Sequence, residues 1–238
     1  MKINSPSPVR LISMCPAKVA MVLIFVALTV SFDVAARGPS QDTIRTANRQ
    51  AFDDYEQGRI LQAVAGYRKA ARLGEPSAQY NLAVIRIRDE SKAVSLHDAL
   101  KYLRTSANAG FAPAQFMLAS LLDNGQLLPK SLFEATAWYE KAAAQGHIDA
   151  AMGAGVQYFL GRGASKDFVR AARWYLIAAQ GGEVAAQYMV ASMYEHGNGV
   201  AIDLQQALEW YSAAARQGDV AAREKSKVLA LQLSGERS

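Results

Sequence analysis

Five glycines recur along the chain at a constant spacing of 36 residues: Gly74, Gly110, Gly146, Gly182 and Gly218. A fixed period between 20 and 50 residues is typical of a repeat array, whose units bury their apolar faces against one another. The spacing therefore predicts a stack of similar supersecondary units. It also favours binding over catalysis, because such stacks present extended surfaces.

Other residue types share this period and predict a helix before each glycine. The segment 135–145 places small and aromatic residues three, four, seven and eight apart, which is helical spacing. The glycine stands where a helix ends in a left-handed residue. Serine or aspartate begins the same helix and is a good N-cap, and Ser131 with Glu134 predicts a capping box. These N-cap residues are Ser95, Ser131, Asp167 and Asp203. We name the predicted helix between cap and glycine helix B.

A second helix, helix A, is predicted to begin near an alanine that follows each glycine by four residues. The segments 78–83, 114–119 and 186–191 are near copies that start with this alanine. Small residues spaced four or five apart let two helices approach closely. Helix A is expected to end near a further glycine, and these are Gly125, Gly161 and Gly197.

The combined pattern resembles the Sel1-like repeat, a relative of the tetratricopeptide repeat with a longer loop between its helices. Its elements are Trp-Tyr-x-x-Ala-Ala-x-x-Gly, Ala-x-x-x-Leu-Ala/Gly and Tyr-x-x-Gly-x-Gly-Val-x-x-Asp, most clearly from Trp174 to Gly218. The resemblance covers about residues 60–223, and the loop 89–94 departs from it because it lacks both glycines. It implies an all-α fold, a right-handed superhelical solenoid of antiparallel helix hairpins with about eleven helices.

This interpretation divides the chain into a leader, a linker and one continuous array. We expect a signal peptide or membrane anchor over 1–36, a flexible linker over 37–46 and the helical array over 47–234. Within the array we expect a tetratricopeptide-like hairpin, four Sel1-like repeats and a capping helix. Their predicted ranges are 47–73, 78–113, 114–149, 150–185, 186–221 and 222–234.

The first 36 residues have the layout of a secretory signal peptide. Three basic residues precede an apolar run over 19–32, and small residues near Ala36 offer a cleavage site. The run has 14 residues, fewer than the roughly 20 that a spanning helix needs. We expect a periplasmic or secreted protein. The alternative is an uncleaved inner-membrane anchor through 19–32 with the array facing the periplasm. The single cysteine, Cys15, precedes the run, so cleavage would leave no disulfide.

The residue types that catalysis and metal binding need do not recur together. His97, His147 and His196 have no histidine or cysteine partner three or four residues away, so no metal site is predicted. We expect no catalytic residues and no cofactor. The net charge of +5 comes from scattered basic residues rather than a basic stripe, so nucleic-acid binding is not expected. The periodic Trp138, Trp174 and Trp210 are interpreted as core rather than as a stacking platform.

We therefore expect a non-enzymatic protein–protein interaction scaffold in the cell envelope, with a partner peptide or helix bound in a concave groove lined by helix A. The predicted groove residues are Tyr80, Phe116, Asp123, Met152, Phe159, Tyr188 and Glu195. An open alternative is that the aromatic members only seal adjacent repeats. The resemblance also implies another function, a secreted cell-wall or β-lactam binder with weak hydrolase activity. However, the paired cysteines of such relatives are missing.

Overall fold

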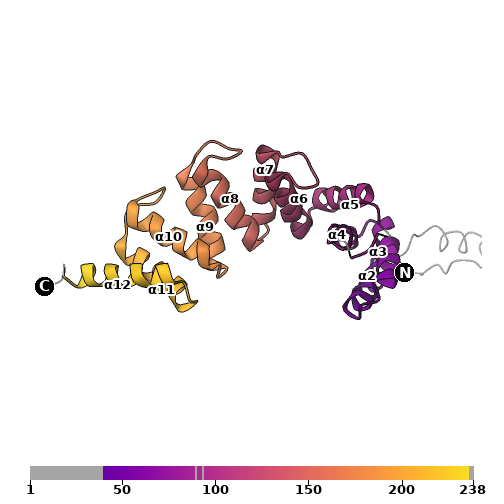
Figure 1. The fold of residues 1–238 in the computed structure, drawn as a ribbon, viewed down its shortest axis with the longest axis horizontal. Helices are drawn as coiled ribbons and strands as arrows, with labels where there is room; N and C mark the ends of the chain where they lie inside the picture. Colours follow the sequence, from indigo (N-terminus) through magenta and orange to yellow (C-terminus); the bar gives the residue numbers. More distant parts are fainter. Residues whose placement is uncertain (1–39, 89, 93, 236–238) are drawn as a thin grey trace, which may run out of the picture. The chain divides into compact units, whose positions relative to one another are not determined.

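The computed structural model describes residues 40–88, 90–92 and 94–235, which contain eleven α-helices and no strand (Figure 1). The helices are α2 (Gln41–Glu56), α3 (Ile60–Arg72), α4 (Pro76–Ile87), α5 (Leu96–Asn108), α6 (Ala112–Asn124), α7 (Leu132–Ala143), α8 (Ile148–Leu160), α9 (Phe168–Gln180), α10 (Val184–His196), α11 (Leu204–Arg216) and α12 (Val220–Gly235). The chain forms two compact units, 1–44 and 45–238. Only residues 40–44 of the first unit are described, so the packing below concerns the second.

Each helix from α3 to α12 packs against the next helix in the chain, as a stack of hairpins requires. The even-numbered helices are the predicted A helices, and the odd-numbered helices are the B helices. In the first hairpin, α2 and α3 approach closely at Ala51 and Gly66, where a Cβ on the glycine would lie 2.8 Å from the alanine Cβ. The predicted all-α solenoid of helix hairpins, with its eleven helices, is thus confirmed.

Several predicted boundaries differ from the observed ones by a few residues. The range 37–46 was expected to be a flexible linker, but α2 begins at Gln41 because the Ser40 hydroxyl accepts a hydrogen bond from the Thr43 amide at 3.2 Å. Helix A begins two residues before the alanine that marked it in the sequence, so the repeats start at 76, 112, 148 and 184. The capping helix likewise starts at Val220 rather than at 222.

The glycine ladder ends five B helices in the same way. All five glycines have a positive φ, between 86° and 100°. At the first of them, the Gly74 amide donates to the Ala71 carbonyl at 3.1 Å, and the Glu75 amide donates to the Ala70 carbonyl at 3.2 Å. These two bonds form a Schellman motif, and the same pair occurs after α5, α7, α9 and α11. The glycines therefore stop helix B and direct the chain into the next helix A.

The predicted N-caps of helix B are confirmed, but the capping box is only half formed. The side chains of Ser95, Ser131, Asp167 and Asp203 each accept a hydrogen bond from the amide three residues later. A full box would use the Ser131 amide to bind Glu134. Instead, this amide donates to the Leu122 carbonyl of α6 at 2.9 Å. The start of helix B is thus bound to the end of its own helix A.

The core combines alanines and aliphatic side chains with one mainly aromatic ladder, which differs from the aromatic ladder that we expected. The ladder Tyr67, Leu103, Tyr139, Tyr175 and Tyr211 is at most 6% exposed. The tryptophans lie one position earlier on helix B and are only half-buried. The interpretation of Trp138, Trp174 and Trp210 as fully buried core residues was therefore wrong. They are half-buried and pack at the edge of the core. One position along a helix turns a side chain by about 100°, enough to move it from the seam to its border.

None of the described helices combines the length and the apolar character needed to cross a membrane. The predicted signal peptide or anchor over 1–36, with its apolar run at 19–32, lies outside the described residues.

Candidate interaction surface

Four side chains of the predicted groove occupy one equivalent position on successive A helices. We call Tyr80, Phe116, Met152 and Tyr188 the helix A row. All four are half-buried, so each both packs against the chain and faces solvent.

The packed side of the row touches the following repeat. Tyr80 meets Phe111 edge-on with ring centroids 5.5 Å apart, and Phe116 stacks on His147 at 4.6 Å. His147 also caps α8, because its Nδ1 accepts from the Ala150 amide at 3.3 Å. Tyr80 and Phe116 therefore pack one side of the ring against the following repeat, and both side chains remain partly exposed.

Two clefts open on this face, one at each end of the row. The first, about 170 Å³, lies between α2 and α4 and is lined by Phe52, Tyr55, Tyr80 and Val84. Phe52 is 51% exposed, although its side chain is large and apolar. The cleft is therefore lined largely by aromatic side chains and is open to solvent.

The second cleft, about 420 Å³, lies between α10 and α12. Tyr188 and Glu195 line one wall, and Lys225 and Val228 belong to the other. Val228 is 64% exposed at the position that Ser192 holds one repeat earlier. The terminal helix thus extends the apolar face beyond the last complete repeat.

The predicted groove acid Asp123 is already engaged by the next repeat. Its Oδ2 accepts from Gln157 Nε2 at 3.0 Å, and its Oδ1 accepts from Arg162 Nη2 at 2.9 Å. Burial, reinforced by this nearby carboxylate, raises the pKa of Tyr139 to about 12. Asp123 therefore joins α6 to α8 and its loop, and it offers a partner less free charge than the sequence indicated.

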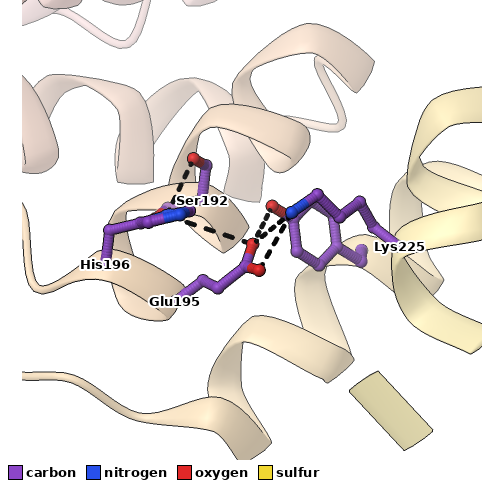
Figure 2. Close-up of polar contacts among 5 residues, drawn as sticks. Ser192, Glu195, His196 and Lys225 are labelled. Atoms are coloured by element: carbon purple, nitrogen blue, oxygen red, sulfur yellow. Dashed lines mark hydrogen bonds and ion pairs between the residues drawn. The ribbon is translucent and has the colours of Figure 1, made fainter. Parts of the chain in front are cut away.

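Glu195 makes the corresponding junction between α10, α11 and α12. Its Oε2 accepts from the Tyr211 hydroxyl at 2.7 Å, and its Oε1 lies 2.9 Å from Lys225 Nζ. Figure 2 shows the Glu195 carboxylate pointing toward Lys225, with His196 on its other side. Burial raises the pKa of Glu195, but the bonds from Tyr211 and Lys225 outweigh it and the net pKa is lowered.

The third predicted residue at this helix A position, Phe159, replaces the acid by an aromatic ring. It lies edge-on to Tyr175 with centroids 6.2 Å apart, where Glu195 instead bonds the tyrosine hydroxyl. Phe159 also contacts Phe168 at 5.2 Å. The structure therefore places all three residues at the seam with the tyrosine ladder.

Ser192, His196 and Glu195 lie close together, but their geometry is not that of a catalytic relay. A relay needs serine and acid on opposite ring nitrogens. Here Nδ1 alone faces all partners: it donates to the Ser192 carbonyl at 2.8 Å and lies 3.5 Å from Ser192 Oγ and 4.0 Å from Glu195 Oε2 (Figure 2). The cluster is thus a connection within the fold. Among the described residues, no group of three histidine, cysteine or acidic side chains could hold a metal ion.

A buried glutamine ladder connects helix A to both neighbouring B helices, and sequence reasoning missed it. Gln187 Nε2 donates to the Ala179 carbonyl of the preceding helix B at 3.2 Å. Its Oε1 accepts from Gln217 Nε2 of the following helix B at 2.9 Å. Gln115 and Gln145 repeat the arrangement two repeats earlier. The signal was the glutamine that follows alanine in each near copy of helix A.

Comparison with known proteins agrees with this architecture. The Sel1 repeat profile matches four consecutive segments that coincide with the observed A–B hairpins: residues 76–111, 112–147, 148–183 and 184–219. Together they make up more than half of the chain. A comparison with curated proteins gave no match.

Two solved structures are similar in both fold and sequence. A Sel1 repeat protein from Oxalobacter formigenes is 31% identical with a TM-score of 0.66, and the alignment covers 78% of this chain and 79% of that one. The c5321 protein, a protective antigen of uropathogenic Escherichia coli strains with an SLR fold, is 29% identical with a TM-score of 0.70. That alignment covers 78% of this chain but only 41% of the antigen, so the chain spans less than half of its length.

Proposed function

Because the chain belongs to the Sel1 repeat family, whose fold is typically a protein–protein interaction scaffold, we propose that it binds a partner protein along its helix A face. We define this face by the helix A row and the two clefts at its ends. Sel1 repeat proteins are generally non-enzymatic. The partner segment is a peptide or an amphipathic helix laid across several repeats.

One observation carries the proposal: clefts with large apolar side chains in their walls flank the helix A row at both ends. Large apolar side chains that are exposed together in one patch of a folded surface mark interaction sites. Phe52 is 51% exposed at one end, and Val228 and Leu231 are 64% and 72% exposed at the other. Both ends can therefore receive apolar side chains of one extended partner, as an apolar trough receives an amphipathic segment.

The two bound acids give the face a stable shape. Asp123 and Glu195 hold neighbouring A helices together through Arg162 and Lys225. The positions of the side chains in the helix A row are therefore fixed in the unbound protein. A preorganised surface loses less conformational entropy on binding. We therefore propose that the helix A row contacts the partner and that the two acids keep this face rigid.

The place of action that we propose is the cell envelope, in the periplasm or outside the cell. The support is the sequence pattern of 1–36, with basic residues before a short apolar run. N-terminal sequencing of the mature protein tests it. An N-terminus at Arg37 supports export with cleavage, whereas a retained Met1 supports the inner-membrane anchor.

Site-specific photo-crosslinking in the native cell tests the binding face. A photoreactive phenylalanine analogue is placed at Phe52 or Val228, and in a control at Gln205, which is exposed on the helix B α11. We expect the same partner protein to be crosslinked from 52 and 228 and not from 205. Crosslinks that are absent from the face, or equally strong from position 205, would reject the assignment.

A further inference from the structure

Four of the five B helices carry a second exposed surface, which we call the outer ridge. Its members lie four residues apart on each helix, so they form one stripe, and equivalent members recur every 36 residues. They are positions 61, 65 and 69 of α3, 97, 101 and 105 of α5, 133, 137 and 141 of α7, and 169, 173 and 177 of α9. All twelve positions are exposed. The fifth B helix, α11, does not continue the ridge, because Glu209 stands at the position equivalent to 101 and 173.

The first position of the ridge is apolar in three of the four helices. Leu61, Phe133 and Val169 are 69%, 76% and 58% exposed. They stand at the start of helix B, next to the loops that connect the two helices of each hairpin. Leu127 and Leu160, at the same edge, are also exposed. This edge of the array therefore shows a row of large apolar side chains to solvent.

Later positions of the ridge are cationic in all four helices. Lys69, Lys101, Lys141 and Arg173 stand there, and none of the twelve positions is acidic. Lys69 and Lys141 lie eight residues after the apolar position, which is about 12 Å along a helix. Lys101 and Arg173 lie four residues after the first position. The ridge thus combines an apolar edge with a parallel row of positive charge.

Aromatic side chains border the cationic row. Lys141 Nζ lies 3.9 Å from the Trp138 ring centroid. Arg173 and Trp174 line a cleft of about 280 Å³, together with Ile177 and the bound pair Glu140–Arg170. Trp138, Trp174 and Trp210 are the only tryptophans of the chain. Each is half-buried, so part of each indole faces the surface.

We infer that the outer ridge is a docking surface for an anionic lipid bilayer. Exposed cations attract the acidic headgroups, and exposed apolar side chains enter the membrane–water interface. Tryptophan side chains are favoured at this interface because they have both an apolar ring and a polar N–H group. Charge complementarity identifies the partner as anionic. A bilayer fits better than one acidic protein, because the cations and apolar side chains are spread over four helices instead of concentrating in one buried centre.

The surface is independent of the proposed partner-binding face. The ridge lies on the B helices, whereas the helix A row and its clefts are built from the A helices, with Tyr67 of α3 at the floor of the first. A ridge bound to lipid would leave the helix A face available for a protein. The two proposals can therefore fail separately.

Quenching of tryptophan fluorescence by brominated lipids tests the inference on the full chain. Trp138 and Trp174 lie on ridge helices and Trp210 lies on the next helix B, α11. Quenching therefore reports contact on the B-helix side of the array even if the N-terminal segment also enters the bilayer. We expect quenching by vesicles with brominated phosphatidylglycerol, weaker quenching in 0.5 M salt, and little with uncharged phosphatidylcholine.

Two variants and one control locate the contact. A variant in which all four ridge cations, Lys69, Lys101, Lys141 and Arg173, are replaced by glutamine should bind the vesicles at least tenfold more weakly, as measured by quenching. Each cation near an anionic surface contributes about fivefold to the affinity. The double variant Phe133→Ser and Val169→Ser should also weaken it, and it remains informative if the quadruple variant does not fold. The control replaces four exposed A-helix cations by glutamine: Arg45, Arg49, Arg223 and Lys227.

The inference is overturned if wild-type protein shows no quenching with anionic vesicles, which would favour an acidic protein as the partner of the ridge. It is also overturned if the control variant loses as much quenching as the ridge variants. Helicity measured by circular dichroism must be unchanged in the variants that are compared.

Discussion

The Tyr211 hydroxyl donates a 2.7 Å hydrogen bond to the Glu195 carboxylate, which also binds the C-terminal helix. Lys225 of α12 binds the other carboxylate oxygen at 2.9 Å. On the apolar side, Ala222 and Leu229 of α12 join Ala191 and Tyr211 in one buried cluster. The last helix is thus fixed by a polar bond at its surface and by apolar packing beneath it.

Tyr211→Phe should lower the free energy of unfolding by about 1–2 kcal/mol, because it removes a hydrogen bond to a charged group. Urea unfolding measures the change. The matched control is Tyr175→Phe: Tyr175 is equally buried, but its ring lies against Phe159 and no described side chain binds its hydroxyl. A loss as large in the control would show that the bond to Glu195 is not the cause.

Acid should weaken the attachment of α12. The folded-state pKa of Glu195 lies below its ordinary value of 4.5, so the carboxylate stabilises the fold above that pH, and the stabilisation is lost as pH falls through the lowered pKa. The difference in unfolding free energy between wild type and Glu195→Gln should therefore shrink between pH 7 and pH 3. Glu224→Gln, on the exposed side of α12, should leave the pH dependence of stability nearly unchanged.

Ala109→Gln should stabilise the fold by about 0.5–1.5 kcal/mol. Gln79 Oε1 is buried and has no hydrogen-bond partner among the described residues, whereas the equivalent oxygens of Gln115 and Gln187 accept from Gln145 and Gln217.

Ala109 lies at the repeat position that the donor Gln145 occupies one repeat later and the donor Gln217 three repeats later. Thermal unfolding checks the gain. Ala109→Glu provides the control, because an ionised carboxylate cannot donate to Gln79 and should not reproduce the effect.

Gly163→Ala should destabilise the fold by at least about 2 kcal/mol more than Gly146→Ala. Both glycines have a positive φ, of 72° and 86°, so both substitutions carry conformational strain. A Cβ at Gly163 would also lie 2.2 Å from the Leu132 carbonyl oxygen, while a Cβ at Gly146 meets nothing within 4 Å. Equal unfolding free energies for the two variants would show that the loop moves away at little cost.

Tyr175→Ala should cost about 3–5 kcal/mol of stability, and Trp174→Ala clearly less, although tryptophan is the larger side chain. Tyr175 is 2% exposed, and its ring lies against Gly155, where an added Cβ would approach it to 2.6 Å. Trp174 lies at the border of the core and faces a cleft. Chemical denaturation of both variants ranks them, and a larger loss for Trp174 would contradict our description of the core.

Much of the fold was predictable because its signals are local. A left-handed glycine after a helix and a serine or aspartate before one act on neighbouring amides, so the Schellman motifs and the N-caps were visible in the sequence. Leu127 shows where this rule weakens: it holds a φ of 60° at the loop position that glycine occupies in the next two repeats. A search for glycine alone therefore misses the left-handed conformation at this position.

The candidate site was less predictable because it depends on contacts between repeats. Asp123 and Glu195 were predicted as groove residues, but their cationic partners lie 39 and 30 residues away in the sequence. The outer ridge was missed for the same reason. Its four cations are scattered in the sequence and align only when the B helices stack.

The sequence by itself determined the period, the ends of helix B and the family, because these follow from short-range backbone chemistry repeated at a constant interval. Only the tertiary structure decided which face of each helix is buried. One residue of difference turns a side chain by about 100°. That rotation, together with the stacking of neighbouring repeats, places the tyrosines in the core, the tryptophans at its edge and the acids in ion pairs between repeats.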